Sequence, residues 1–298
     1  MKLPFKFIAG CTVAVTMLAT SYGQGTGYTT SFAPADFNAN ASLSGQQLWD
    51  TNNFTAANPP SIPFDLGQSD FVGIVSGYST TVNDYWALLG GATGIAPVVN
   101  TSTLFRPLDL TGATGAAFDV KFGIISSQNP RPNQDSFGWT FRDSLGNQLL
   151  RVGFIPDINQ ANNLTVRVWD RLDLELPGSG LFNVLYNSKY DLSVNMSSGS
   201  LVNMSITSTV PGSLPTTIIN NQLDAGAVPT SIADVAATWT LADPTANPNG
   251  ERPNFGSNSL VFDNYSVTPI PIPEPSTALF GLVGVVSGFV VRRRQRSA

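Results

Sequence analysis

Apolar and polar residues alternate in short stretches along most of the chain. Between residues 24 and 269, no long segment has the 3.6-residue period of an amphipathic helix. Stretches with a period of two recur instead, and Gly, Asn, Asp, Ser and Pro separate them. This pattern predicts a series of about a dozen strands joined by turns.

Several of these predicted strands have a clear apolar face. GAAFDVKFGIISS (115–127) alternates regularly, and DSFGWTFRDSLGNQLLRVGF (135–154) predicts a hairpin with DSLGN as its turn. NLTVRVWD (163–170) follows, and further short strands are expected near 189–196, 201–210, 236–241 and 259–267. The side chains that we expect to face the core are Phe118, Val120, Phe122, Ile124, Phe137, Trp139, Phe141, Leu164, Val166 and Val168.

Strands with one apolar face must pack in two layers that cover each other. The pattern therefore predicts an all-β fold, a single antiparallel sandwich or jelly roll that spans residues 24–269. No linker divides this body, so we expect one domain. Charged residues make up only 12% of the chain, which is typical of an exported β-rich protein.

The first 23 residues have the layout of a secretory signal peptide, an apolar helix behind basic residues. Lys2 and Lys6 precede an apolar run from Phe7 to Ala19, and small residues follow. We expect signal peptidase to cut after Gly23. The alternatives are an uncleaved anchor, for which the run is short, and lipidation of Cys11, which should close the run rather than lie inside it.

A second apolar run, from Thr277 to Val291, lies near the C-terminus. As a helix its fifteen residues would reach about 22 Å, short of the roughly 30 Å hydrocarbon core of a membrane. Arginines follow the run and belong on the cytoplasmic side. Pro273 and Pro275 precede it and keep the chain extended just outside the predicted transmembrane helix.

The tail at 270–298 resembles the PEP-CTERM sorting signal of exosortase substrates. The resemblance lies in the order of three parts: a Pro-Glu-Pro motif, an apolar span at about 277–291 and a basic terminus. The matching residues of the motif and the terminus are Pro273, Glu274, Pro275, Arg292, Arg293 and Arg294. The resemblance implies that an exosortase-type membrane enzyme processes the chain at Pro-Glu-Pro, and that the body reaches the cell surface or extracellular matrix of a Gram-negative bacterium. An ordinary tail anchor is the alternative.

The body resembles laminin-G-like and concanavalin A-like sandwiches. The similar stretches are SLSGQQLW (42–49), the strands between 118 and 154, and LVFDNYSVTP (260–269). The resemblance is a pattern of strands and turns, without a diagnostic motif. It implies the fold, but this fold carries lectins, glycosidases, lyases and spacers alike.

The charge and the composition of the body exclude several functions. Without the basic residues at the two ends and Glu274, nine basic residues remain against nineteen acidic ones, a net charge of −10. Such a body repels nucleic acid. Histidine is absent and the one cysteine is Cys11, so the body has no Ser-His-Asp triad, no thiol chemistry and no His or Cys metal site.

The sharpest catalytic candidate is the pair Asp173 and Glu175, in WDRLDLELPG (169–178). Some glucanases of this fold place their carboxylates on one strand as Glu-x-Asp-x-Glu. On a regular strand these two side chains would share a face, about 6–7 Å apart. However, Arg171 occupies the position of the family's nucleophile. The alternative interpretation is a solvated polar face.

Two loops offer oxygen ligands for a structural calcium ion. DPTANPNGERPN (243–254) carries Asp243, Asn247, Asn249 and Glu251, and SQNPRPNQDS (127–136) carries Asn129, Asn133 and Asp135. Neither loop has EF-hand spacing. Turns capped by their own Asn and Asp side chains explain the same residues without a metal. We expect no other cofactor.

Aromatic side chains offer a way to bind sugar rings by stacking. Trp49 and Trp86 lie nearest turn-like sequence and are the first candidates, ahead of Trp139, Trp169 and Tyr265. Tryptophan on an alternating strand is otherwise a core residue.

These features together predict an exported, sorted, non-enzymatic protein whose body binds an extracellular polysaccharide. The alternative is a carbohydrate-active hydrolase or lyase that uses Asp173 and Glu175.

Overall fold

The computed structural model describes residues 25–33, 36–37, 43, 45–52, 71–76, 85–91, 101–110, 113–126, 135–157, 159–160, 162–197, 201–223, 232–240 and 258–271. The predicted signal peptide lies outside these residues, and so does the predicted sorting tail apart from Ile270 and Pro271, which belong to the last described strand. Within the described part of the chain, no helix is long and apolar enough to cross a membrane.

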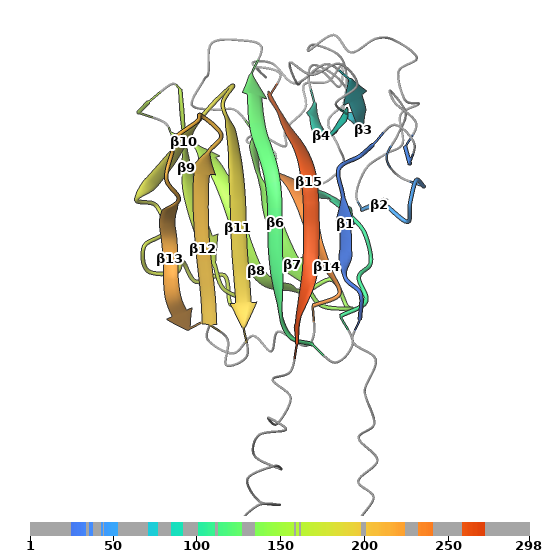
Figure 1. Ribbon diagram of the computed structural model, residues 1–298. Helices are drawn as coiled ribbons and strands as arrows, with labels where there is room; N and C mark the ends of the chain where they lie inside the picture. The colour runs from blue at the N-terminus through green and yellow to red at the C-terminus, as the bar shows by residue number, and fades with distance from the viewer. Residues whose placement is uncertain are drawn as a thin grey trace, which may run out of the picture.

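The described strands form two antiparallel sheets that pack face to face (Figure 1). The front sheet has the order β13-β12-β11-β6-β15-β4-β3, with β1 also paired to β15. Its strands are β1 (Tyr28–Thr30), β3 (Phe71–Ser76), β4 (Tyr85–Gly91), β6 (Ala113–Ser126), β11 (Lys189–Ser197), β12 (Leu201–Ser208), β13 (Thr216–Leu223) and β15 (Asn258–Pro271).

The back sheet has the order β10-β9-β8-β7-β14-β5-β2. Its strands are β2 (Asp50–Asn52), β5 (Thr101–Phe105), β7 (Ser136–Arg142), β8 (Gln148–Pro156), β9 (Asn163–Trp169), β10 (Phe182–Leu185) and β14 (Asp234–Thr240). The predicted all-β fold with two antiparallel layers is confirmed.

Period-two alternation places the predicted apolar faces in the core between the sheets. All ten predicted side chains on β6, β7 and β9 are buried, none with more than 2% of its surface exposed. Phe122 of the front sheet stacks on Phe154 of the back sheet, with 4.6 Å between ring centroids. Burial of this much apolar surface is the main force that holds the two layers together.

The hairpin of β7 and β8 turns where the sequence predicts it. The Oδ1 atom of Asp143 accepts hydrogen bonds from the backbone N–H groups of Leu145 and Asn147, at 2.8 and 2.9 Å. Gly146 has a φ of 81°, a conformation that glycine adopts without steric cost. The side-chain hydrogen bond from Asn147 is the largest cause of a lowered pKa at Asp143. The turn is therefore stabilised by Asp143, Gly146 and Asn147, which belong to the DSLGN stretch that predicted it.

The first and last described strands lie side by side. β1 runs antiparallel to β15, and Tyr28 pairs with Val267 near the end of β15. The chain therefore enters the sandwich and leaves it at one end, the lower end in Figure 1. We call this the terminal end of the sandwich.

Candidate functional site

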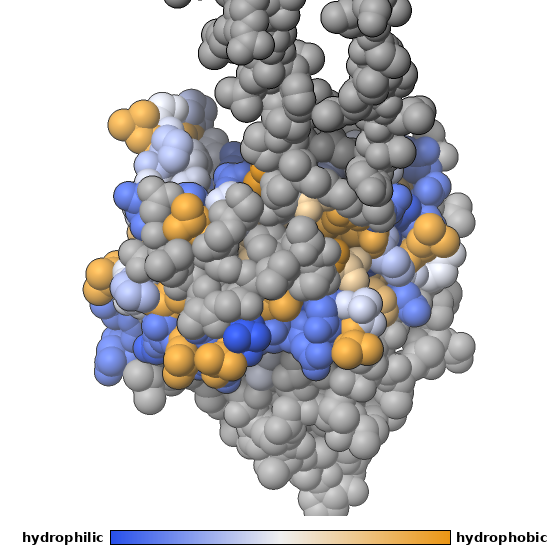
Figure 2. All heavy atoms as spheres, turned by 90° about the horizontal axis from the view of Figure 1, so that it is seen from below, coloured by the Kyte–Doolittle hydropathy of each residue, from blue (hydrophilic) through white to orange (hydrophobic). Residues whose placement is uncertain are grey.

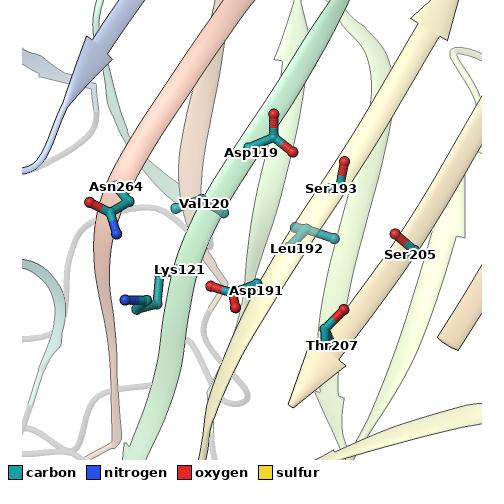
Figure 3. A pocket seen from close by; sticks show the side chains of 9 residues that line it. All are labelled: Asp119, Val120, Lys121, Asp191, Leu192, Ser193, Ser205, Thr207 and Asn264. Carbon is teal, nitrogen blue, oxygen red and sulfur yellow. The ribbon is translucent and has the colours of Figure 1, made fainter. Parts of the chain in front are cut away.

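The outer face of the front sheet carries a polar hollow of about 250 Å³. We call it the front-sheet hollow. The lining residues come from four strands, β6, β11, β12 and β15 (Figure 3). They are Asp119, Val120, Lys121, Asp191, Leu192, Ser193, Ser205, Thr207 and Asn264.

The alternation that builds the core also builds this hollow. Val120 and Leu192 are buried between the sheets, so their neighbours along each strand point to the outer face. Asp119 and Lys121 of β6 and Asp191 and Ser193 of β11 are such neighbours. The outer face is polar because apolar and polar residues alternate along each strand, and the apolar ones point into the core.

Strand register then brings these polar side chains into two rows. Thr207 lies opposite Asp191, which lies opposite Lys121. In the next row, Ser205 lies opposite Ser193, which lies opposite Asp119. Opposite residues on adjacent antiparallel strands have Cβ atoms about 4.5–5.5 Å apart. The hollow thus offers carboxylates, hydroxyls and an ammonium group within the span of one or two sugar rings.

A bulge in β15 completes one side of the hollow. The register with β6 shifts between Asp263 and Ser266, and Asn264 has a φ of 50°. Asparagine adopts this left-handed conformation more readily than most residues. The bulge leaves the amide of Asn264 exposed at the rim, and Figure 3 places Lys121 between Asn264 and Asp191.

The hollow has a mixed electrostatic character. Partial burial raises the pKa of Asp191, and the nearby charge of Lys121 opposes that rise. Among the described residues, no ion pair joins Asp119, Lys121 or Asp191 to another side chain. Both carboxylates and the ammonium group are therefore available to a ligand.

The described residues contain no group of three or more acidic side chains that could hold a metal ion. The candidate calcium ligands Asp243, Asn247, Asn249 and Glu251 lie outside the described residues, as do Asn129 and Asn133. Asp135 is described and buried, and its Oδ2 atom accepts a hydrogen bond from Nε1 of Trp239 at 2.9 Å. This contact gives Asp135 a structural role in the back sheet.

The prediction that Asp173 and Glu175 share the face of one strand is wrong. β9 ends at Trp169, and residues 170–174 form a turn in which Asp173 has a φ of 61°. Asp170 organises this turn, because its buried Oδ1 atom accepts hydrogen bonds from the N–H groups of Leu172 and Leu174. The turn could not be predicted from the local pattern, because WDRLDLELPG has no glycine before position 178 to mark it.

Each carboxylate of this pair has its own arginine. Asp173 accepts a hydrogen bond from Arg151 at 2.7 Å, and Glu175 accepts one from Arg167 at 2.9 Å. Glu175 also accepts a hydrogen bond from the hydroxyl of Ser179 at 2.7 Å.

Trp49 has no face to offer a sugar, which corrects its place among the stacking candidates. Only 1% of its surface is exposed. Its ring packs against Tyr28 and Phe32, and against Tyr265, whose centroid is 5.1 Å away. Tyr265 and Trp139 are buried in the same core. The side chain of Trp86 lies outside the described residues.

Trp169 is partly exposed, and its ring contacts two residues of β8. The guanidinium of Arg151 lies 3.9 Å from the ring centroid. The other contact is with Gly153, where an added Cβ atom would approach the ring to 2.8 Å. Glycine at this position makes room for the tryptophan, so Trp169 braces the back sheet.

No protein-family model matches the chain, and no curated protein is significantly similar to it. Among solved structures, the chain is similar to a protein described as cellulose-induced, at 12% identity over 82% of this chain and 98% of that one, with a TM-score of 0.48. A family 131 glycoside hydrolase catalytic domain from Coprinopsis cinerea matches at 11% identity over 83% and 95%, with a TM-score of 0.46. Lotus tetragonolobus seed lectin matches at 14% identity over 68% and 95%, with a TM-score of 0.39. These likenesses are too distant to assign a function.

Proposed function

We propose that the chain is an exported, exosortase-sorted protein of the cell surface or extracellular matrix, whose sandwich binds a neutral glycan without cleaving it. The front-sheet hollow is the observation that carries the glycan-binding part. Sugars present closely spaced hydroxyl groups that both donate and accept hydrogen bonds. Carboxylates accept from such groups, an ammonium donates to them, and serine, threonine and asparagine do both. The hollow supplies all of these from adjacent strands.

The charge of the body favours a neutral glycan over an acidic one. The body carries a net charge of −10, and the hollow contributes two carboxylates against one lysine. Polyanions such as uronic acid polymers would be repelled. Because none of the described residues that line the hollow is aromatic, we expect a weak affinity for a single glycan segment, on the order of 1 mM.

The non-enzymatic part of the proposal is supported by the state of Asp173 and Glu175. A retaining or inverting glycosidase needs two carboxylates that face one bond of the substrate. These two carboxylates lie in and after a turn and are each bound to a different arginine. The alternative, a hydrolase or lyase built on this pair, would require both ion pairs to open.

A glycan array beside a reducing-end assay on the purified protein tests the proposal. We expect binding to neutral glycans and no release of reducing ends. Turnover of any bound glycan would support the alternative enzyme. Absence of both binding and turnover would leave a structural role in the matrix and contradict the glycan proposal.

The sorting part of the proposal has its own test. Replacing Pro273, Glu274 and Pro275 with alanine removes the motif but keeps the apolar span and the arginines. We expect the variant to remain with the membrane while the native chain is processed. Loss of the variant from the membrane at the native rate would contradict processing at the Pro-Glu-Pro motif, and retention of both chains would indicate an ordinary tail anchor.

A further inference from the structure

Two turns at the terminal end of the sandwich expose leucine side chains. Leu145 lies in the turn at 143–147 and is 85% exposed. Leu172 and Leu174 lie in the turn at 170–174 and are 58% and 59% exposed. We call these the leucine turns. Single exposed leucines are common on protein surfaces, so the significance of these three depends on where they lie.

Backbone contacts show that the leucine turns lie at the end where the chain enters the sandwich. The N–H of Gly27, just before β1, donates to Asp109, and the N–H of Leu108 donates to Ala233. The N–H of Ala233 donates to Arg142, the residue that precedes the first leucine turn. This series of contacts crosses the terminal end from β1 to the back sheet.

The two leucine turns also adjoin each other. The side-chain amide of Gln148, which follows the first turn, donates to the carbonyl oxygen of Asp170 at 2.7 Å. Figure 2 looks at the terminal end and shows hydrophobic residues at several places around it, set among hydrophilic ones. Within their turns the leucines have exposed polar neighbours, among them Ser144, Asn147, Arg171 and Asp173.

The chain beyond β15 limits how far this end can lie from a membrane. β15 ends at Pro271, and the apolar span begins at Thr277, so five residues connect them. A fully extended chain advances at most about 3.3–3.6 Å per residue, so this connection reaches roughly 20 Å. If the span crosses the bilayer, as the proposed sorting function requires, the terminal end must stay within that distance of the lipid surface.

We propose that the leucine turns insert into the lipid surface while the tail is still attached. The occupant is the bilayer interface itself, where short apolar side chains are buried among headgroups and upper acyl chains. The contact orients the body on its short tether with the terminal end down. The front-sheet hollow then opens sideways, because its strands run from this end to the opposite one. Processing at Pro-Glu-Pro would release both the tether and this weak contact.

An environment-sensitive fluorophore tests the contact in the full chain. Cysteine replaces Leu145 or Leu174 in a chain whose native Cys11 is serine, and the labelled protein is reconstituted into phosphatidylcholine and phosphatidylethanolamine vesicles. Leu214→Cys is the matched control, because Leu214 is 83% exposed in the turn between β12 and β13, at the opposite end. All three side chains lie outside the core, so the fold should survive each change.

We expect a blue-shifted emission, and quenching by nitroxide-labelled lipid, at positions 145 and 174 and not at 214. Equal emission at all three positions would overturn the inference. A shift that appears only in native membranes, and not in pure lipid, would overturn it in favour of a protein partner. Flotation after carbonate extraction checks the premise separately: a chain that fails to float lacks the span, and the inference falls with the sorting proposal while glycan binding stands.

Discussion

The two sheets of this sandwich use their carboxylates in opposite ways. In the described part of the back sheet, Asp234, Asp173 and Glu175 are each bound to an arginine. On the outer face of the front sheet, Asp119 and Asp191 have no such partner among the described residues and lie in a hollow with Lys121. Only the buried pair of Asp234 and Arg142 is expected to contribute much to stability, whereas Asp119 and Asp191 remain available to a ligand. Acidic residues that look alike in the sequence therefore differ in whether an arginine already binds them.

The largest effect should come from the buried pair of the back sheet. Arg142 contacts both carboxylate oxygens of Asp234, at 2.7 and 2.9 Å, and both side chains are about nine-tenths buried. Burial raises the pKa of Asp234 more than Arg142 lowers it, so the pair is costly to bury. Arg142→Leu leaves the carboxylate alone, and we expect a loss of roughly 3–5 kcal/mol in the free energy of unfolding.

Urea unfolding measures this loss, and the double variant with Arg142→Leu and Asp234→Leu is its control. Replacing both charges with apolar groups should recover much of the lost stability. If the single variant unfolds like the native protein, the pair does not hold the fold and the contrast between the sheets weakens.

A smaller effect is expected at the turn that follows β9. Asp170 accepts two backbone hydrogen bonds through Oδ1 and is 2% exposed. Asp170→Ala should lower the free energy of unfolding by about 1–2 kcal/mol, since it leaves two partly buried donors without their acceptor. Asp170→Asn keeps an oxygen at this position and should cost much less. Equal losses in the two variants, measured by thermal unfolding, would show that the charge matters and the acceptor does not.

The exposed ion pairs of the back sheet should matter least to stability. The side chain of Asp173 is 67% exposed and that of Glu175 is 34% exposed. Asp173→Asn and Glu175→Gln should each change the free energy of unfolding by less than about 1 kcal/mol. Neither substitution should alter glycan binding. A loss of binding with unchanged stability would move the candidate site to the back sheet.

The pH dependence of stability tests the carboxylates of the front-sheet hollow. Burial raises the pKa of Asp191 above the ordinary value of 3.8, so the folded state binds this proton more tightly than the unfolded state. Its contribution to stability is complete below pH 3.8 and is lost as the pH rises through the raised pKa. The native protein should therefore lose a little stability relative to Asp191→Asn as the pH rises above 3.8. Identical pH profiles would contradict the raised pKa.

The sequence predicted the layers better than it predicted the sites. Phe118, Val120 and Phe122 were assigned to the core from alternation alone, and burial confirms them. In the structure, the residues between them, Asp119 and Lys121, line the front-sheet hollow. What alternation does not contain is register, because pairing is decided by which strands become neighbours. The pairing of β6 with β11 could therefore not be predicted from the sequence of either strand.

The sequence pattern predicted neither the turn at 170–174 nor the burial of Trp49, and the reasons differ. A polar-apolar alternation in RLDLE reads as a strand, but Asp170 captures the backbone N–H groups locally and prevents the ladder from continuing. Trp49 precedes a strand of three residues, and only the packing of Tyr28 and Tyr265 from distant parts of the chain buries it. Local pattern could not reveal either outcome.

The most direct test of the account measures the affinity for the best glycan on the array in two matched variants. Asp119→Ala with Asp191→Ala removes two carboxylates from the front-sheet hollow, and Asp173→Ala with Glu175→Ala removes two from the back sheet. Isothermal titration should give a dissociation constant at least about tenfold weaker for the first variant, since hydrogen bonds to charged groups contribute roughly 1.5–3 kcal/mol, and an unchanged constant for the second. Equal affinities in the first variant and the native protein, with both folded, would contradict the assignment of glycan binding to the front-sheet hollow.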